Sequence, residues 1–334
     1  MPDLTCVSTF SGAGGSSTGY EAAGFTVLWA NEFVPAAAQT YAANHPNAIL
    51  DTRDIRTVTA ADVLDATGLD VGELDLLDGS PPCAAFSTGG KRSEKWGQVN
   101  KYSDTAQRVD DLFFEYVRLL RGIQPKTFIA ENVPGLTMGP AVGYFNAIMA
   151  ALSGCGYQVK AQVLDASRLG VPQARRRVIF AGVRDDLGCQ PVYPRQGPMT
   201  PLGVVLGPHA RISIYRPRGW VHYTANRPCP TIQSTGLNGR AYAQTCLTGV
   251  IALDLDPEIG CPLAVTSKDV NSIWPGRYRR LPSIVEVKAL CGFPSDYILT
   301  GSYGQRWERL GRAVPPPVAA AVAASLRDGV LCAV

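Results

Sequence analysis

A single thiol stands in an unusually stiff stretch of the chain. Cys83 follows two prolines in GSPPCAAFS (79–87), just after a short apolar run that ends in Asp-Gly. Prolines and glycines define the backbone around this thiol, which indicates a side chain that is oriented rather than packed. A thiolate is a good nucleophile. Taken alone, a cysteine in such a stretch is more often simply buried in a tight turn, and an oriented thiol is the alternative.

A glycine-rich turn and two carboxylates form a second candidate site. FSGAGGSS (10–17) lies between an apolar run and a helical segment, where glycines allow a cofactor to approach backbone N–H groups closely. Glu32 follows about 20 residues later, at the usual spacing for an acid that binds ribose hydroxyls. Asp54 follows the next short segment and is placed to accept from an adenine amino group. Together these residues favour a nucleoside cofactor over solvated loop charges.

The elements that position these residues alternate along the first half of the chain. Apolar runs predict strands at 4–10, 25–33, 74–78 and 126–133, and helical spacing predicts helices at 17–23, 34–44, 106–122 and 141–153. Two further strands, 157–166 and 176–183, are expected to pair. Residues 186–275 are rich in Pro and Gly and show short β-like runs without a convincing helix. Helical patterns return after 282 and in the alanine-rich segment near the end.

Composition sets outer limits on function. The 334 residues are 46% hydrophobic and 18% charged, with a formal net charge of +3, which is typical of a globular protein and allows a nucleic-acid partner. The nine cysteines show no metal-ligand spacing, so we expect no metal site and no disulfide framework. No signal peptide or membrane span is evident, which favours a cytoplasmic protein without membrane contact.

Five motifs occur in a fixed order: FSGAGG, GSPPCAAFS, ENV, QARRR and GRAVPPPVA. This ordered set resembles the DNA cytosine-5 methyltransferase family over nearly the whole chain outside 186–275. The resemblance implies an α/β, Rossmann-like S-adenosylmethionine-dependent methyltransferase fold with a small β-rich target-recognition domain. The expected domains are a catalytic and cofactor-binding domain (1–185), a target-recognition domain (186–275) and a C-terminal segment that completes the catalytic domain (276–334).

The resemblance also implies a mechanism. Carbon 5 of cytosine becomes nucleophilic only after a nucleophile adds to carbon 6, and Cys83 matches the family's nucleophile. Glu131 of ENV matches the acid at N3 of the ring. Arg177 matches the arginine that holds the cytosine O2, and Arg175 matches its neighbour near a phosphate or the active-site loop. These four residues are the expected catalytic set.

The implied cofactor is S-adenosyl-L-methionine. Phe33 is expected to stack on adenine, and Pro82 to support the cysteine loop. The expected cofactor-binding residues are Phe10, Gly12, Gly14, Glu32, Phe33, Asp54, Ile55, Pro82, Arg312 and Val314.

The implied substrate is double-stranded DNA, with the target base flipped out of the helix. The basic segment after Cys83 suits a loop that closes over DNA, and IQSTGLNGR (232–240) resembles the segment that begins recognition. Residues 186–280 hold ten Arg or Lys against five Asp or Glu, a bias that suits phosphate contact. The expected DNA-binding residues are Ser87, Lys91, Arg92 and Arg240.

One departure from the family pattern bears on the transferred group. The last motif normally contains Gly-Asn, but here Arg312 replaces the asparagine. A guanidinium is unfavourable near a sulfonium cation unless an anion lies between them. Carboxy-S-adenosyl-L-methionine would supply a carboxylate, and the product would then be 5-carboxymethylcytosine. The alternative is that Arg312 turns away and binds another group.

Four functions therefore remain open. They are a DNA cytosine-5 methyltransferase, free-standing or paired with a restriction system, a DNA carboxymethyltransferase, an RNA methyltransferase, and an inactive relative that only binds DNA. The intact Cys83, Glu131 and Arg177 argue against the inactive relative, and the insert at 186–275 favours duplex DNA. We expect a monomer of bacterial or phage origin.

Overall fold

The computed structural model describes residues 4–82, 99–101, 106–108, 111–216, 219–234, 236–237, 245–248 and 282–333. The chain divides into two compact units. Unit 1 comprises residues 1–164, 176–196 and 313–334, and unit 2 comprises 165–175 and 197–312. This division differs from the expected boundaries at 185 and 276, because it groups the helices between 284 and 312 with the β-rich part of the chain.

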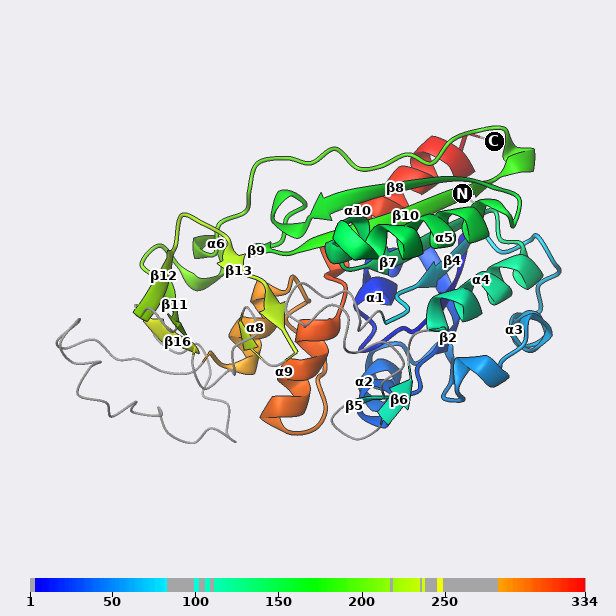
Figure 1. The fold of residues 1–334 in the computed structure, drawn as a ribbon. Coiled ribbons are helices and arrows are strands. Elements are labelled where there is room, and N and C mark those ends of the chain that lie inside the picture. Colours follow the sequence, from blue (N-terminus) through cyan, green and yellow to red (C-terminus); the bar gives the residue numbers. More distant parts are fainter. Residues whose placement is uncertain are drawn as a thin grey trace. The chain divides into compact units, whose positions relative to one another are not determined.

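Unit 1 is built on one seven-stranded sheet with the order β3-β2-β1-β4-β7-β10-β8 (Figure 1). Its first five neighbouring strands are parallel, whereas β10 runs antiparallel to β7. The bounds are β1 Leu4–Thr9, β2 Phe25–Asn31, β3 Ile49–Asp51, β4 Leu76–Gly79, β7 Thr127–Asn132, β8 Tyr157–Asp165 and β10 Arg176–Arg184. The predicted pairing of the last two strands is confirmed, since β8 and β10 are neighbours.

The strand order places the candidate chemistry at one edge of the sheet. The chain builds β1, β2 and β3 in one direction and then returns to the other side of β1 with β4. Ligands of open α/β sheets bind at this switch point, beyond the carboxyl ends of the strands. The glycine turn follows β1, and the segment that leads to Cys83 follows β4. The parallel register therefore brings the two candidate sites of the sequence to the same edge.

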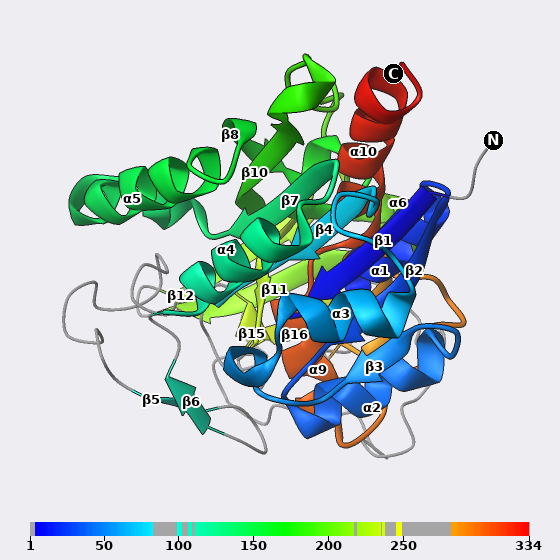
Figure 2. The same cartoon turned by 90° about the vertical axis from the view of Figure 1, so that its right-hand side faces the viewer.

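Helices cover both faces of this sheet (Figure 2). Helices α3, α4 and α5 lie on one face, while α1 and α10 pack together on the other. The helix bounds are α1 Gly15–Ala22, α2 Pro35–Asn44, α3 Ala60–Thr67, α4 Leu112–Ile123, α5 Val142–Ser153 and α10 Pro316–Leu326. The main apolar core forms between the sheet and the first group. Its largest members are Trp29, Tyr116, Phe128 and Phe180, each 2% exposed or less.

The predicted helix at 106–122 begins later than expected. Residues Ala106–Arg108 form strand β6 and pair in antiparallel fashion with β5, Val99–Lys101. The helix α4 then starts at Leu112. The apolar pattern of the helix continues only from Leu112 onward, where seven of its residues are buried.

The C-terminal helix α10 lies beside α1, the helix that begins at the glycine turn. It packs against α1 so closely that a Cβ added to Gly19 would lie 2.4 Å from the carbonyl oxygen of Pro316 and 2.6 Å from the Cβ of Ala319. Only glycine permits this distance. The helix that begins at the glycine turn is therefore fixed by the last helix of the chain.

Unit 2 contains a three-stranded antiparallel sheet with the order β12-β11-β16 and several short strand pairs. Strand β13 pairs with β9, and β14 pairs with β15. Its bounds are β9 Gln173–Ala174, α6 Gly203–Leu206, β11 Arg211–Arg216, β12 Gly219–Thr224, β13 Cys229–Pro230, β14 Ile232–Gln233, β15 Gly236–Leu237, β16 Thr245–Thr248, α8 Ile284–Leu290 and α9 Tyr303–Arg312. The β-rich texture expected after residue 186 is present, with the short α6 in addition.

Within the described part of the chain, no helix is long and apolar enough to cross a membrane. The same residues contain no group of three or more His, Cys, Asp or Glu side chains arranged to hold a metal ion.

Candidate active site

The glycine turn after β1 has a strained backbone. Phe10, Gly12 and Gly14 all have positive φ, at 52°, 57° and 85°. For a bulky residue such as Phe10 this is a rare and costly conformation, which persists where the surrounding structure imposes it. Among the residues that the structure describes, a Cβ added to Gly12 would meet no atom within 4 Å. The glycine thus leaves open space beside the backbone, where a ligand can approach.

Glu32 fastens this turn from the end of β2. One carboxylate oxygen accepts from the Gly12 N–H at 2.7 Å, and the other accepts from the Val34 N–H at 2.6 Å. The Ser11 N–H and hydroxyl both donate to the Asn31 carbonyl, at 3.0 and 2.8 Å. Glu32 is 7% exposed. The predicted ribose-binding acid therefore lies directly beside the predicted glycine turn.

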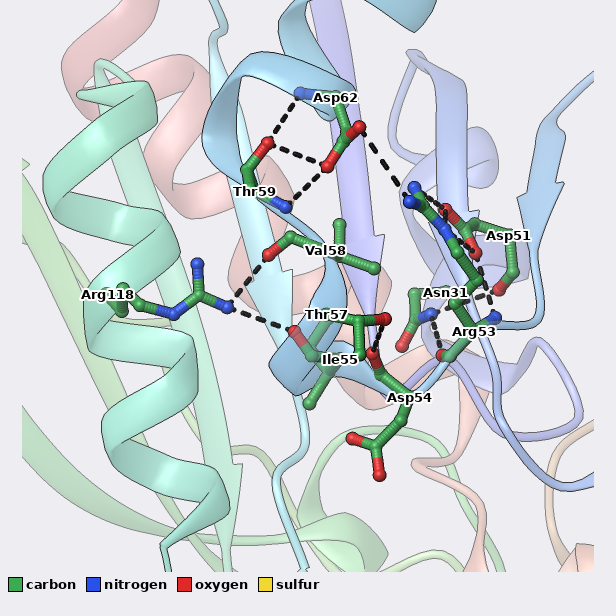
Figure 3. Close-up of polar contacts among 10 residues, drawn as sticks. All are labelled: Asn31, Asp51, Arg53, Asp54, Ile55, Thr57, Val58, Thr59, Asp62 and Arg118. Carbon is green, nitrogen blue, oxygen red and sulfur yellow. Dashed lines mark hydrogen bonds and ion pairs between the residues drawn. The ribbon is translucent and has the colours of Figure 1, made fainter.

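Asp54 and Ile55 form a short helical turn, η1 (Ile55–Thr57), after β3 (Figure 3). Arg118 of α4 donates to the carbonyls of Ile55 and Val58, at 3.0 and 2.8 Å, and so holds the turn against the sheet. The Asp54 carboxylate pairs with Arg56 at 3.1 Å. Ile55 is buried and lies in the main core. The turn that carries Asp54 is thus anchored from α4.

The remaining predicted cofactor residues fall at different points. Phe33 is half-buried and follows Glu32, Pro82 follows β4, and Val314 precedes α10. Arg312 is the last residue of α9, in unit 2, and its guanidinium lies 2.9 Å from the Glu308 carboxylate one turn earlier. The predicted residues that lie outside the described structure are Cys83, Ser87, Lys91, Arg92 and Arg240.

Glu131 and Arg177 lie together on neighbouring strands. Glu131 is on β7 and Arg177 is on the adjacent antiparallel strand β10. The Arg177 Nε lies 2.6 Å from Oε1 of Glu131, and the two side chains are 19% and 14% exposed. A charge-assisted contact of this length fixes the orientation of the carboxyl group. The arrangement presents a partly exposed acid with an arginine beside it at the edge of the sheet.

Asn132, the middle residue of ENV, also takes part in the site, although the sequence interpretation gave it no role. Its side-chain amide donates to the Pro81 carbonyl at 3.2 Å, and its own oxygen accepts from the Val133 N–H at 2.8 Å. Pro81 lies two residues before Cys83. Asn132 therefore ties the backbone that leads to the thiol to the strand that carries Glu131. Its adjacency to Glu131 in the motif was the only sequence signal for this function.

Asp78 is a second residue that the sequence interpretation did not assign. Its buried carboxylate accepts from Ser8 (2.8 Å) and Ser16 (2.9 Å) at one oxygen and from Tyr20 (2.6 Å) at the other. Burial raises the pKa of this carboxyl group from 3.8 to about 6, although the three hydroxyl donors oppose the shift. Asp78 thereby joins β4 to β1 and to the first helix after the glycine turn.

The motif QARRR divides between the two units. Arg177 belongs to unit 1, whereas Gln173 and Arg175 belong to unit 2. The buried Arg175 guanidinium donates to the carbonyls of Ile232 and Gly311, both at 3.0 Å, and of Arg312 at 3.3 Å. These contacts hold backbone in place, which differs from the expected contact with a phosphate or the active-site loop.

The chemistry of this edge is well defined. The neighbouring strands β1, β2, β3, β4 and β7 are parallel. The glycine turn follows β1, Glu32 follows β2 and Asp54 follows β3. The segment that leads to Cys83 follows β4, and Glu131 lies near the end of β7. Such a set combines close backbone approach for a nucleoside with an acid that can exchange a proton. It is the arrangement of an α/β group-transfer enzyme.

Comparison with known proteins identifies the class. The family model for C-5 cytosine-specific DNA methylases matches residues 4–203 and 223–328. The chain therefore belongs to this family, and it is an enzyme of the DNA (cytosine-5-)-methyltransferase type. The predicted family and the Rossmann-like fold are confirmed.

Individual relatives agree with this assignment. Type II methyltransferase M1.HphI of Haemophilus parahaemolyticus is 27% identical over 96% of this chain and 86% of its own length. M.NgoPII of Neisseria gonorrhoeae is 35% identical over 58% of this chain and 51% of its own length. The crystal structure of a mutant DNMT2 of Spodoptera frugiperda has a TM-score of 0.66 at 17% identity, and covers 95% of this chain and 98% of that one. The last similarity shows the fold alone.

Proposed function

We propose that this enzyme transfers a methyl group from S-adenosylmethionine to carbon 5 of a flipped cytosine in duplex DNA, through a covalent adduct of Cys83 at carbon 6. The observation that carries the proposal is the contact system around Glu131. Its carboxyl group is oriented by Arg177, and the next residue, Asn132, holds the backbone two residues before Cys83. The strand that carries the proposed acid is thereby joined to the backbone that leads to the proposed nucleophile.

The glycine turn and its neighbours fit S-adenosylmethionine. The space beside Gly12 suits a cofactor, and the Glu32 carboxylate lies at the turn, at the sequence spacing of an acid that binds ribose hydroxyls. Asp54 offers a carboxylate for adenine, with Phe33 as a stacking partner, while the buried Ile55 anchors this turn in the core. When bound, S-adenosylmethionine supplies a methyl group made electrophilic by its sulfonium. This set of residues would hold it.

Besides the target cytosine and S-adenosylmethionine, the proposed reaction needs only a solvent base. The Cys83 thiolate forms a bond to carbon 6 while Glu131 gives a proton to N3, which makes carbon 5 nucleophilic. Carbon 5 would then take the methyl group as its bond to the sulfonium breaks, and S-adenosylhomocysteine would be left. Loss of the carbon 5 proton to a solvent base breaks the bond to sulfur, and N3 returns its proton to Glu131. The thiolate is regenerated, and Arg177 keeps the acid oriented throughout.

The carboxymethyl alternative shares this mechanism but differs in the group that is transferred. That alternative requires the Arg312 guanidinium to bind the cofactor's carboxylate. In this structure the guanidinium pairs with Glu308 at 2.9 Å. Because Glu308 already provides an anionic partner, we propose methyl as the transferred group and S-adenosylmethionine as the cofactor. We further propose a modification role like that of the bacterial Type II enzymes it resembles.

Nucleoside mass spectrometry tests this function directly. Duplex DNA would be treated with the purified enzyme and S-adenosylmethionine, its carboxy form, or an equal mixture, with tRNA as a parallel substrate and Cys83→Ala as the control. The proposal predicts methylcytosine in DNA as the dominant product from the mixture. Dominant carboxymethylcytosine, or methylation of tRNA alone, would contradict it. An active Cys83→Ala variant would contradict the covalent mechanism.

A further inference from the structure

The residue Ile232 is held on both sides of its peptide backbone. The Gln173 side-chain oxygen accepts from the Ile232 N–H at 3.1 Å, and the Arg175 guanidinium donates to the Ile232 carbonyl at 3.0 Å. All three residues are buried, at 3% exposed or less. Hydrogen bonds to a charged donor in a buried site are among the stronger ones. The first and third residues of QARRR thus fix the backbone of β14.

The next peptide is held by helix α9. The Trp307 indole N–H donates to the Gln233 carbonyl at 3.0 Å. One turn later, a Cβ added to Gly311 would lie 2.3 Å from the Gln233 carbonyl carbon and 2.5 Å from the Ser234 nitrogen. The helix therefore rests directly on the Gln233–Ser234 peptide, and glycine at 311 is what permits the contact.

The same arginine joins the two sides of this contact. Arg175 also donates to the carbonyls of Gly311 and Arg312 at the end of α9, where a helix has carbonyls without intrahelical partners. A single guanidinium thus connects the helix end to β14. We name the set of Arg175, Trp307 and Gly311 the backbone clamp.

The clamped segment opens the stretch IQSTGLNGR. Strand β14 pairs with β15 across a tight connection, with Ile232 opposite Leu237 and Gln233 opposite Gly236. The backbone is thus held at Ile232, Gln233 and Ser234, where this hairpin begins. A shift of that backbone would move the whole connection, since a short hairpin transmits displacement along both strands.

We propose that the backbone clamp consists of positioning residues for DNA recognition. By fixing Ile232–Ser234 it sets the geometry with which this hairpin meets DNA, so that it governs DNA affinity and sequence selectivity rather than cofactor binding or the chemical step. The proposal rests on the proposed function, in which duplex DNA is the substrate.

The test compares two glycines of the same helix. Gly311→Ala forces a methyl group into the Gln233–Ser234 peptide, whereas Gly304→Ala is its matched control, because a Cβ at Gly304 meets nothing within 4 Å. Steady-state kinetics on DNA should show a KM for DNA raised about tenfold in Gly311→Ala, with kcat changed by less than about threefold. Binding of S-adenosylhomocysteine, measured by calorimetry, should be unchanged, and methylation of near-cognate sites should rise relative to cognate sites.

A second variant keeps the test decisive if Gly311→Ala does not fold. Trp307→Phe retains an aromatic ring but removes the N–H donor to Gln233, and we expect it to raise the KM for DNA by about threefold in the same assays. The proposal is overturned if both variants match Gly304→Ala in their KM for DNA, or if they lower kcat or cofactor binding instead. A wild-type enzyme that modifies no DNA would reject the proposed function itself.

Discussion

At the scale of single residues, the site depends on how carboxyl groups are held. Glu131 lies 2.6 Å from Arg177, which orients it, while Asp78 is surrounded by hydroxyl donors in the interior. The first group is partly exposed and can exchange a proton with a substrate. The second is buried and can only organise its neighbours. Two acids of the same edge therefore have different roles, which their surroundings determine.

Replacement of the proposed acid should affect the chemical step. Glu131→Gln keeps the shape but removes the exchangeable proton, so we expect kcat to fall by about two to four orders of magnitude while the KM for DNA changes little. Asp186→Asn, which alters an exposed ion pair with Arg184, should leave kcat unchanged. The measurement is transfer of labelled methyl groups to DNA. Retention of near wild-type kcat in Glu131→Gln would remove this residue from the mechanism.

Asp78 should make stability depend on pH. Because burial raises its pKa from 3.8 to about 6, the folded protein keeps a proton that the unfolded chain loses between these values. This stabilising contribution is complete below about pH 4 and is lost as the pH rises through about 6. Between about pH 5 and pH 7.5 the free energy of unfolding should fall by roughly 1 kcal/mol for this reason. Asp78→Asn cannot titrate. Denaturant unfolding would measure the free energies of unfolding of the wild type and of Asp78→Asn. The difference between the two should change by this amount over the same pH range. A constant difference would contradict the shifted pKa.

At the scale of elements, short connections after parallel strands carry the proposed function. The turn at 10–14 combines a strained Phe10, two glycines of positive φ and a carboxylate clamp from Glu32. Helix α1, which follows it, is fixed in turn by α10 through Gly19. The turn is therefore preformed by contacts inside the protein, and ligand binding need not order it.

The turn at Gly12 should be essential for the cofactor. Gly12→Ala imposes a side chain at φ 57°, which costs about 1 kcal/mol, and it also fills the space beside the turn. We expect binding of S-adenosylhomocysteine to weaken by at least about tenfold, which calorimetry would measure. Gly143→Ala in α5 is the matched control, since a Cβ there also meets no neighbouring atom and φ is not positive. Equal affinity in the two variants would place the cofactor elsewhere.

The contact between α1 and α10 should contribute to stability. Gly19→Ala places a methyl group within 2.4 Å of the Pro316 carbonyl oxygen, a distance that requires the backbone to move. We expect a loss of about 1–3 kcal/mol in the free energy of unfolding, which chemical denaturation would measure. Gly143→Ala should lose far less. A Gly19→Ala variant as stable as the wild type would mean that the two helices pack less closely than described.

At the scale of the whole molecule, the sequence predicted the strands and the chemistry at their ends, because apolar runs and glycine turns are local signals. The family resemblance singled out Glu131 and Arg177 separately, and their ion pair is seen only in the fold. Helix α9 went unpredicted, although Tyr303, Trp307 and Leu310 have helical spacing, because its other residues are polar. The carboxylate network of Asp78 was out of reach, since its donors come from β1 and α1, far away in the sequence.

The division of QARRR between two units shows the same limit. Neighbouring arginines look alike in the sequence, yet Arg175 is buried against backbone carbonyls and Arg177 meets a carboxylate. Arg175 lies between β9 and β10 and belongs to unit 2, whereas Arg177 lies on β10 in unit 1, and only the fold reveals which partner each one meets. One motif thus supplies Arg177 to the candidate active edge and Arg175 to the backbone clamp.

The most direct test of the account is to capture the covalent adduct. Duplex DNA with 5-fluorocytosine at the target would be incubated with the enzyme and S-adenosylmethionine, because fluorine at carbon 5 prevents the elimination that releases the thiol. Peptide mass spectrometry should find DNA linked to Cys83, with no link in Cys83→Ala. A link at another cysteine, or turnover on ordinary DNA without any trapped adduct, would contradict the proposed mechanism.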